Sequence, residues 1–117
     1  MTKRTKSLGN KGEAIALRYL IKKNYQILDK NYRTRYGEID IIAKHGDYVV
    51  LVEVKTKTTI DQGTAEEMVN KKKQKKLLLL SKLIEQKYTQ HNIRIDVVAI
   101  DTSGQKPIIN HLINAVT

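Results

Sequence analysis

Residues 37–55 contain two runs rich in β-forming residues, and they constrain the fold more than any other part of the chain. The runs meet at Gly46-Asp47, a pair typical of a two-residue hairpin turn. His45 should therefore pair with Tyr48, and the residue numbers of every cross-strand pair should sum to 93. The sequence predicts an antiparallel hairpin as the centre of the fold.

The same register brings acidic side chains together where burial should exclude them. It places Asp40 opposite Glu53, and Glu38 opposite Lys55, on one face of the hairpin. Two carboxylates about 5 Å apart would repel by roughly 3 kcal/mol at an effective dielectric of about 20, a cost that a structural hairpin has no reason to carry. A divalent cation would reverse the sign of that interaction. The alternative is a solvated ladder of ion pairs at an exposed strand end, but charged groups inside an apolar sheet more often mark sites.

Both faces of the predicted hairpin are partly apolar, as expected for a central pair covered by helices. One face should carry the inner residues Ile39, Ile41, Ala43, Val50, Val52 and Val54. The other should carry Ile42, Val49 and Leu51 together with the charges. The hairpin should therefore lie inside a layered domain.

The rest of the chain predicts an α/β fold with the order α-β-β-β-α-β-β. We expect helices at 7–23 and 64–88, and strands at 25–35, 37–45, 48–55, 92–101 and 108–116. Residues 1–7 should form a basic, mobile segment, and Asn24 should end the first helix. The second helix should begin at Thr64, which opens a capping-box pattern, or at Asn70. A helix between the third and fourth strands permits a crossover, so we expect a mixed sheet flanked by helices.

The composition favours a single domain with a polyanionic partner. A chain of 117 residues suits one domain, and 22 Lys and Arg against 12 Asp and Glu give a net charge of +10. An anionic membrane surface is the competing interpretation, but no apolar run approaches the roughly 20 residues of a spanning helix. The absence of Cys excludes thiolate metal sites and agrees with a reducing compartment. We therefore expect a cytoplasmic protein of one domain, residues 1–117, that binds any metal through oxygen or imidazole ligands.

The opposed acids offer the ligands that Mg²⁺ prefers. Asp40, Glu53 and a main-chain carbonyl such as that of Val54 provide hard oxygen atoms. Lys55 lies on the same face and would orient an attacking water molecule. His45, His91 and His111 have no metal-ligand spacing, and we assign them no chemistry.

The chain closely resembles the bacterial YraN family over nearly its whole length. The motifs that carry the resemblance are Gly12-Glu13 with Ala16 and Tyr19-Leu20, Asn31-Tyr32-Arg33, and residues 37–43 (GEIDIIA), 52–55 (VEVK), 94–101 (RIDVVAID) and 111–115 (HLINA). That family is similar to the PD-(D/E)xK nuclease superfamily, which includes archaeal Holliday junction resolvases. The resemblance implies a restriction-endonuclease-like core.

The resemblance also implies a role for each acid. It assigns Asp40 as the metal-binding aspartate, Glu53 as the acidic motif residue and Lys55 as the motif lysine. Glu13 matches an acid that resolvase-like members supply from their first helix to complete the metal site; the alternative is a first-turn glutamate favoured by the helix dipole. Ile39 stands where the superfamily's name has Pro. Glu38 has no agreed role there, and we treat it as a partner of Lys55 outside the metal ligands.

The implied activity is hydrolysis of DNA phosphodiester bonds with Mg²⁺ or Mn²⁺, on branched or otherwise structured DNA, and a homodimer is left open. A catalytically silent nucleic-acid-binding module with a nuclease-like fold is the alternative. The basic run Lys71, Lys72, Lys73 and Lys75 would contact the DNA backbone or form a solvated helix face. Arg33 and Arg35, which alternate with Tyr32 and Tyr36, would bind phosphates or end a polar strand. Gln74 and Asp96 would support the site, although Asp96 could simply pair with Arg94.

Overall fold

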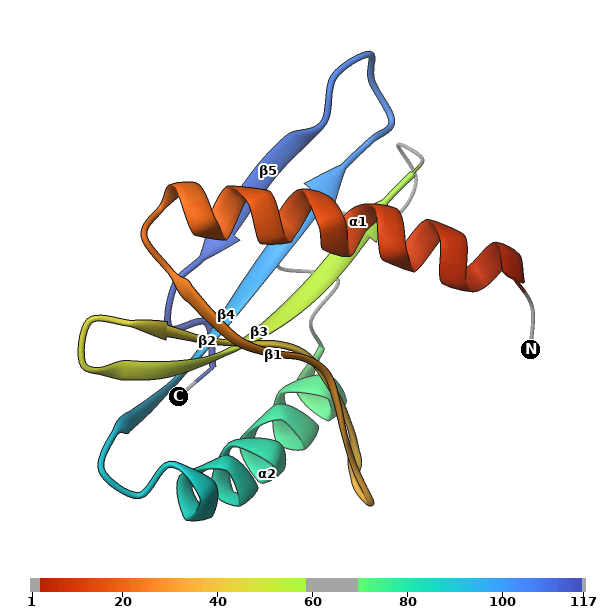
Figure 1. The fold of residues 1–117 in the computed structure, drawn as a ribbon. Helices are drawn as coiled ribbons and strands as arrows, with labels where there is room; N and C mark the ends of the chain where they lie inside the picture. Colours follow the sequence, from red (N-terminus) through yellow and green to blue (C-terminus); the bar gives the residue numbers. More distant parts are fainter. Residues whose placement is uncertain (1–2, 59–69, 117) are drawn as a thin grey trace.

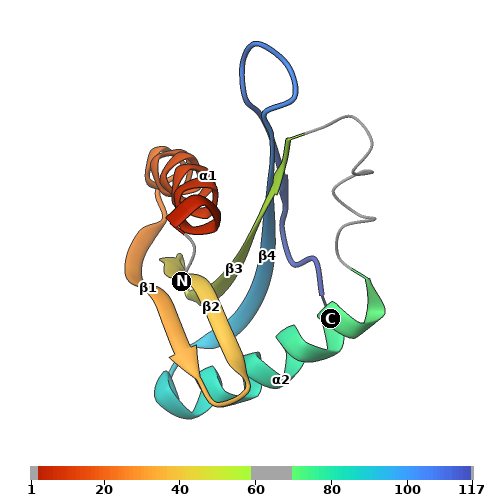
Figure 2. The same ribbon diagram turned by 90° about the vertical axis from the view of Figure 1, so that its right-hand side faces the viewer.

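The computed structural model describes residues 3–58 and 70–116 and confirms the predicted order of elements. The elements are α1 (Lys3–Lys22), β1 (Gln26–Thr34), β2 (Gly37–His45), β3 (Tyr48–Lys57), α2 (Lys71–Lys87), β4 (Asn92–Asp101) and β5 (Ile108–Leu112). The strands form one mixed sheet in the order β1-β2-β3-β4-β5, in which only β3 and β4 are parallel. Helix α1 covers one face of the sheet and α2 the other (Figures 1 and 2).

Two apolar clusters, one on each face of the sheet, form the core. The α1 side consists of Ala16, Leu20, Tyr25, Ile41, Ala43, Val50, Val52, Val98 and Ile100. The α2 side consists of Ile39, Ile42, Val49, Leu51, Leu77, Leu80, Ile84, Ile95, Val97 and Val116. Because both faces are covered, β2, β3 and β4 are near-continuous apolar runs.

The predicted hairpin register is confirmed from the turn to the middle of the strands. The recorded pairs run from His45 with Tyr48 to Ile41 with Val52. Gly46 supplies the positive φ of 59° that the tight turn requires. The prediction for Ile39 was wrong, because its side chain packs on the α2 side rather than beside Ile41. The alternation of β2 is therefore interrupted between these two residues, at Asp40.

The element ends follow local chemistry, with some changes from the prediction. Asn24 ends the first helical segment with a φ of 69°, as expected for a residue that tolerates the left-handed region. Helix α1 begins at Lys3, so residues 3–7 belong to the helix. Asn70 caps α2 by accepting a hydrogen bond from the Lys73 N–H, whereas the capping box at Thr64 lies outside the described residues. Among the described helices, none is long and apolar enough to cross a membrane.

Candidate metal centre

The strands β2 and β3 diverge at Asp40. Their recorded pairs end at Ile41 with Val52, and beyond this point the β1–β2 hairpin bends away from β3 (Figure 1). The Asp40 carboxylate accepts a hydrogen bond from the Val54 N–H at 2.8 Å. The predicted Asp40–Glu53 pair thus falls one step beyond the recorded ladder. The Asp40 side chain, and not a backbone carbonyl, therefore accepts the hydrogen bond that β3 donates here. We call this point, where β2 and β3 separate at Asp40, the fork.

Three carboxylates meet at this fork. One oxygen from each of Glu13, Glu38 and Asp40 lies within 4.8 Å of the other two. Glu13 reaches the fork from α1 because Gly12 allows the helix to approach β3: a Cβ atom on Gly12 would collide with the Thr56 hydroxyl. The structure therefore brings together the predicted Glu13 and Asp40, which come from different elements.

The electrostatics of the fork disfavour carboxylate ionisation. Burial and the nearby Glu53 raise the pKa of Asp40 to about 7, against the opposing hydrogen bond from Val54. Burial and the charge of Glu38 also raise the pKa of Glu13. Such like-charge crowding is typical of carboxylates that share a site. A divalent cation would relieve it.

Glu53 lies beside these carboxylates but is held by lysines. Its side chain is buried, with 6% of its surface exposed. Its Oε1 atom is 3.1 Å from Lys73 Nζ and 3.4 Å from Lys55 Nζ. The Glu53–Lys55 proximity agrees with their predicted common face. Lys73, which was predicted only to bind DNA, also contacts Glu53. This contact was not predictable from the sequence, because it depends on how α2 packs against the sheet.

The predicted pairing of Glu38 with Lys55 was wrong. Glu38 does not extend the β2–β3 register to Lys55 but pairs in the β1–β2 ladder with Arg33, and Arg33 Nε lies 3.5 Å from its carboxylate. The reason is the divergence of β3 from β2 at Asp40. Glu38 therefore belongs among the clustered carboxylates. Arg33, whose side chain is 79% exposed, still faces solvent at the edge of the cluster.

A basic hollow adjoins the carboxylates. It has a volume of about 300 Å³ and is lined by Lys55, Asn70, Lys72, Lys73 and Lys76. The other predicted DNA contacts Lys71, Lys75 and Arg35 are exposed. Arg35 lies over the ring of Tyr36, 5.1 Å from its centroid. The supporting role of Gln74 and the ligand role of the Val54 carbonyl remain predictions.

Asp96 belongs to a different polar network. Its buried carboxylate accepts hydrogen bonds from Arg94, Tyr25 and the Asn114 N–H, and it lies 2.8 Å from His111 Nε2. Burial alone would raise the pKa of Asp96, but the bonds from His111 and Arg94 lower it to about 2. The predicted pairing with Arg94 is confirmed. None of these hydrogen-bond partners belongs to the carboxylate cluster, so Asp96 does not brace it.

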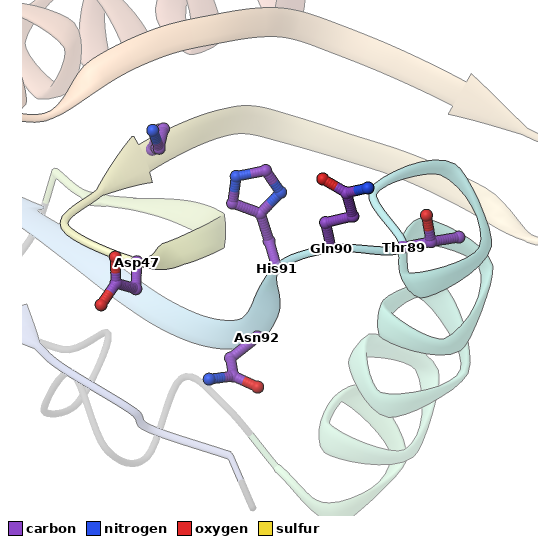
Figure 3. Close-up of a pocket in the computed structure, with 6 residues that line it drawn as sticks. Asp47, Thr89, Gln90, His91 and Asn92 are labelled. Atoms are coloured by element: carbon purple, nitrogen blue, oxygen red, sulfur yellow. The ribbon is translucent and has the colours of Figure 1, made fainter.

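A second hollow lies away from the carboxylates. It measures about 480 Å³ and lies at the turn end of the β2–β3 hairpin, lined by Lys44, Asp47, Thr89, Gln90, His91 and Asn92. Figure 3 shows Asp47 at the turn and the other labelled residues along the connection from α2 to β4. The lining of this hollow is polar and contains one acid, Asp47. Among the described residues, the clustered acids lie at the fork and not at this hollow.

The comparisons with known proteins agree with the resemblance seen in the sequence. The model of the uncharacterised protein family UPF0102 matches residues 12–100, which include every acid of the fork. A UPF0102 protein of Geobacter metallireducens is 43% identical over 98% of this chain and 96% of its own length. A UPF0102 protein of Alkaliphilus oremlandii is 44% identical over 94% of this chain and 97% of its own length. One of Rhodococcus opacus is 42% identical over 93% of this chain and 95% of its own length. The chain therefore belongs to the UPF0102 family, which is the YraN family.

Proposed function

We propose that this protein is a Mg²⁺-dependent endonuclease that hydrolyses phosphodiester bonds in structured or branched DNA in the cytoplasm. The observation that carries the proposal is the convergence of Glu13, Glu38 and Asp40 beside the Glu53–Lys55 pair. The resemblance to nucleases assigns four of these five residues to catalysis. Their origin in separate elements supports a selected site over a chance patch.

The donor set fits a hard divalent cation. Glu13, Glu38 and Asp40 offer carboxylate oxygens, which Mg²⁺ and Mn²⁺ prefer over nitrogen or sulfur. Burial and neighbouring carboxylates raise the pKa values of Asp40 and Glu13, and a divalent cation would favour their ionised forms. When bound, the cation supplies charge stabilisation to the phosphoryl and leaving oxygens during in-line attack by water.

The lysines have complementary tasks. Lys55 and Lys73 hold the Glu53 carboxylate between them at 3.4 and 3.1 Å. Lys55 also lines the basic hollow, so its ammonium group can contact both a phosphate oxygen and the attacking water. Glu53 keeps this ammonium group at the edge of the carboxylate cluster. The site would thus combine carboxylates that bind a cation with ammonium groups that bind a phosphate.

The charge distribution supports DNA as the substrate. The basic hollow and the exposed Lys71, Lys75 and Arg35 would contact phosphates, and the net charge of +10 would steer a polyanion to the surface. Lys55 and Lys73 of this hollow also contact Glu53 beside the acidic fork. They would hold a backbone across the carboxylates instead of letting it be repelled.

The test is a cleavage screen on defined branched, nicked, single-stranded and duplex DNA, with RNA counterparts, in Mg²⁺, Mn²⁺ or EDTA. We expect metal-dependent cutting that Asp40→Ala and Lys55→Ala each reduce by roughly a hundred- to a thousandfold, as when charge-stabilising groups are removed from other active sites. Asp47→Ala, at the exposed β2–β3 turn, is the matched control and should cut normally. Equal residual activity in wild type and both site variants would indicate contamination and refute the proposal.

A catalytically silent nucleic-acid-binding module is the second candidate, favoured by the exposed lysines on α2. It predicts salt-sensitive DNA binding that is indifferent to divalent metal and to Glu53→Ala. Fluorescence anisotropy in Mg²⁺ and in EDTA separates the two candidates.

A further inference from the structure

Asn31 occupies the gap in the β1–β2 ladder opposite Asp40. Regular pairs flank it on both sides, Lys30 with Ile41 and Tyr32 with Ile39. Its φ is 51°, in the left-handed region that Asn tolerates better than most residues. This backbone conformation turns one residue of an edge strand out of the regular alternation.

The Asn31 side chain lies between two of the clustered carboxylates. With the amide oriented so that it donates, its nitrogen is 3.0 Å from Glu38 Oε1 and 3.1 Å from Glu13 Oε1. A side-chain amide nitrogen carries two hydrogens, so one group can serve both acceptors. This bond lowers the pKa of Glu13 against the larger effects of burial and Glu38. One neutral donor thus joins an acid from α1 to an acid from β2.

We propose that Asn31 is a positioning residue that holds Glu13 and Glu38 in place for the divalent cation. The inference rests on the proposed function and adds a residue to its site. The Asn31 amide contacts Oε1 of each carboxylate, and Arg33 Nε lies 3.5 Å from Oε2 of Glu38. Without this donor the two acids, which repel each other, would separate, and the ligand set would have to be reassembled on binding. Groups that orient metal ligands in this way change metal affinity by roughly 10- to 100-fold.

The test uses Asn31→Gly, because glycine tolerates the left-handed backbone and removes the side chain that carries the amide. Asn24→Gly is the matched control: Asn24 also has a positive φ, is exposed, and lies at the end of α1. Titration calorimetry with Mn²⁺ on the folded, full-length chain should give at least a roughly tenfold weaker affinity for Asn31→Gly and no change for Asn24→Gly. Circular dichroism verifies that both variants are folded.

A spectroscopic measurement adds a readout that a purely structural role would not change. The side-chain NH₂ resonances of Asn31, identified by their loss in Asn31→Gly, should shift on titration with Mg²⁺, while those of Asn24 should not. Unchanged Mn²⁺ affinity in Asn31→Gly would overturn the positioning role and leave the proposed nuclease intact. Absence of metal binding by the wild type would overturn both.

Discussion

Asp40 and Asp96 are two aspartates in the same sheet with opposite surroundings. Asp96 is fully buried, yet its carboxylate is surrounded by donors from Arg94, Tyr25 and the Asn114 N–H, with His111 in contact. Asp40 has one recorded donor, the Val54 N–H, and carboxylates as neighbours. The pKa of Asp96 is lowered to about 2, whereas that of Asp40 is raised to about 7.

The comparison shows that burial alone does not identify a functional acid. A buried carboxylate with a full set of donors is already neutralised and contributes to the stability of the fold. A carboxylate with a single donor and acidic neighbours ionises only at a cost, which a bound cation would offset. The Asp96 network therefore belongs to the scaffold, and the fork at Asp40 belongs to the proposed chemistry.

The largest expected effect is on stability, in Asp96→Asn. The substitution removes the charge that neutralises Arg94, and breaking a buried pair costs about 3–5 kcal/mol of unfolding free energy. Urea denaturation at pH 7 measures the loss, with Asp47→Asn as the exposed control. Asp96 has a lowered pKa, so its contribution is present above pH 4 and is lost as the pH falls toward 2. A loss below about 1 kcal/mol would contradict the assignment of Asp96 to the scaffold.

Asp40→Asn should do the reverse and stabilise the metal-free protein. Because the pKa of Asp40 is raised to about 7, ionisation of Asp40 removes stability as the pH rises from about 4 through 7. An amide cannot ionise, and its oxygen can still accept from the Val54 N–H. We expect a gain on the order of 2 kcal/mol at pH 8, reduced from the full shift for partial exposure. Urea denaturation in EDTA between pH 4 and 8 should show this gain vanish toward pH 4; equal stability at pH 8 would refute the unfavourable ionisation.

Metal affinity should depend on pH in the same range. A cation must displace the proton that Asp40 retains below about pH 7, so affinity should rise about tenfold per pH unit below 7 and flatten above it. Calorimetry with Mn²⁺ between pH 5.5 and about 8 measures this, and proton release in buffers of different ionisation enthalpy confirms its origin. A flat profile would mean that Asp40 is not a ligand.

The smallest expected effect comes from Lys73. Lys73→Met removes one of the two ammonium groups that hold Glu53, and the remaining Lys55 should limit the loss to about 1 kcal/mol or less. Lys75→Met, on the exposed surface of the same helix, is the control and should change stability negligibly. Thermal unfolding at low salt distinguishes the two. Equal effects would mean that Lys73 is also a solvated lysine.

Local patterns predicted the hairpin and the order of elements, since turn chemistry and period-two alternation are properties of neighbouring residues. The Arg94–Asp96 pair followed from the same alternation. The left-handed φ of Asn31 was not predictable in this way. The β1–β2 ladder lacks a pair at Asn31, and β3 diverges from β2 at Asp40 opposite it, so Ile39 was assigned to the wrong face and Glu38 to the wrong partner.

Contacts between distant segments were harder to predict. Glu13 entered the site through the family resemblance, because nothing in a helical pattern indicates which part of the sheet the middle of α1 approaches. Lys73 required the position of α2, and the partners of Asp96 come from residues 25, 94, 111 and 114. Alternation and the hairpin turn were predictable because they depend on nearby residues, whereas contacts between distant elements depend on the packing of the whole domain.

The parallel pairing of β3 with β4 has a consequence for the order of folding. The ladder joins Tyr48 to Asn92 and Lys57 to Asp101, so it must close a long loop, whereas the β2–β3 hairpin closes across two residues. Such non-local pairing slows folding, because chain entropy is lost before contacts compensate for it. During synthesis, at about 5–20 residues per second, the acids of residues 13–53 leave the ribosome several seconds before β4 can complete the sheet. The nascent chain therefore carries its carboxylates through an interval in which the sheet that should hold them is unfinished.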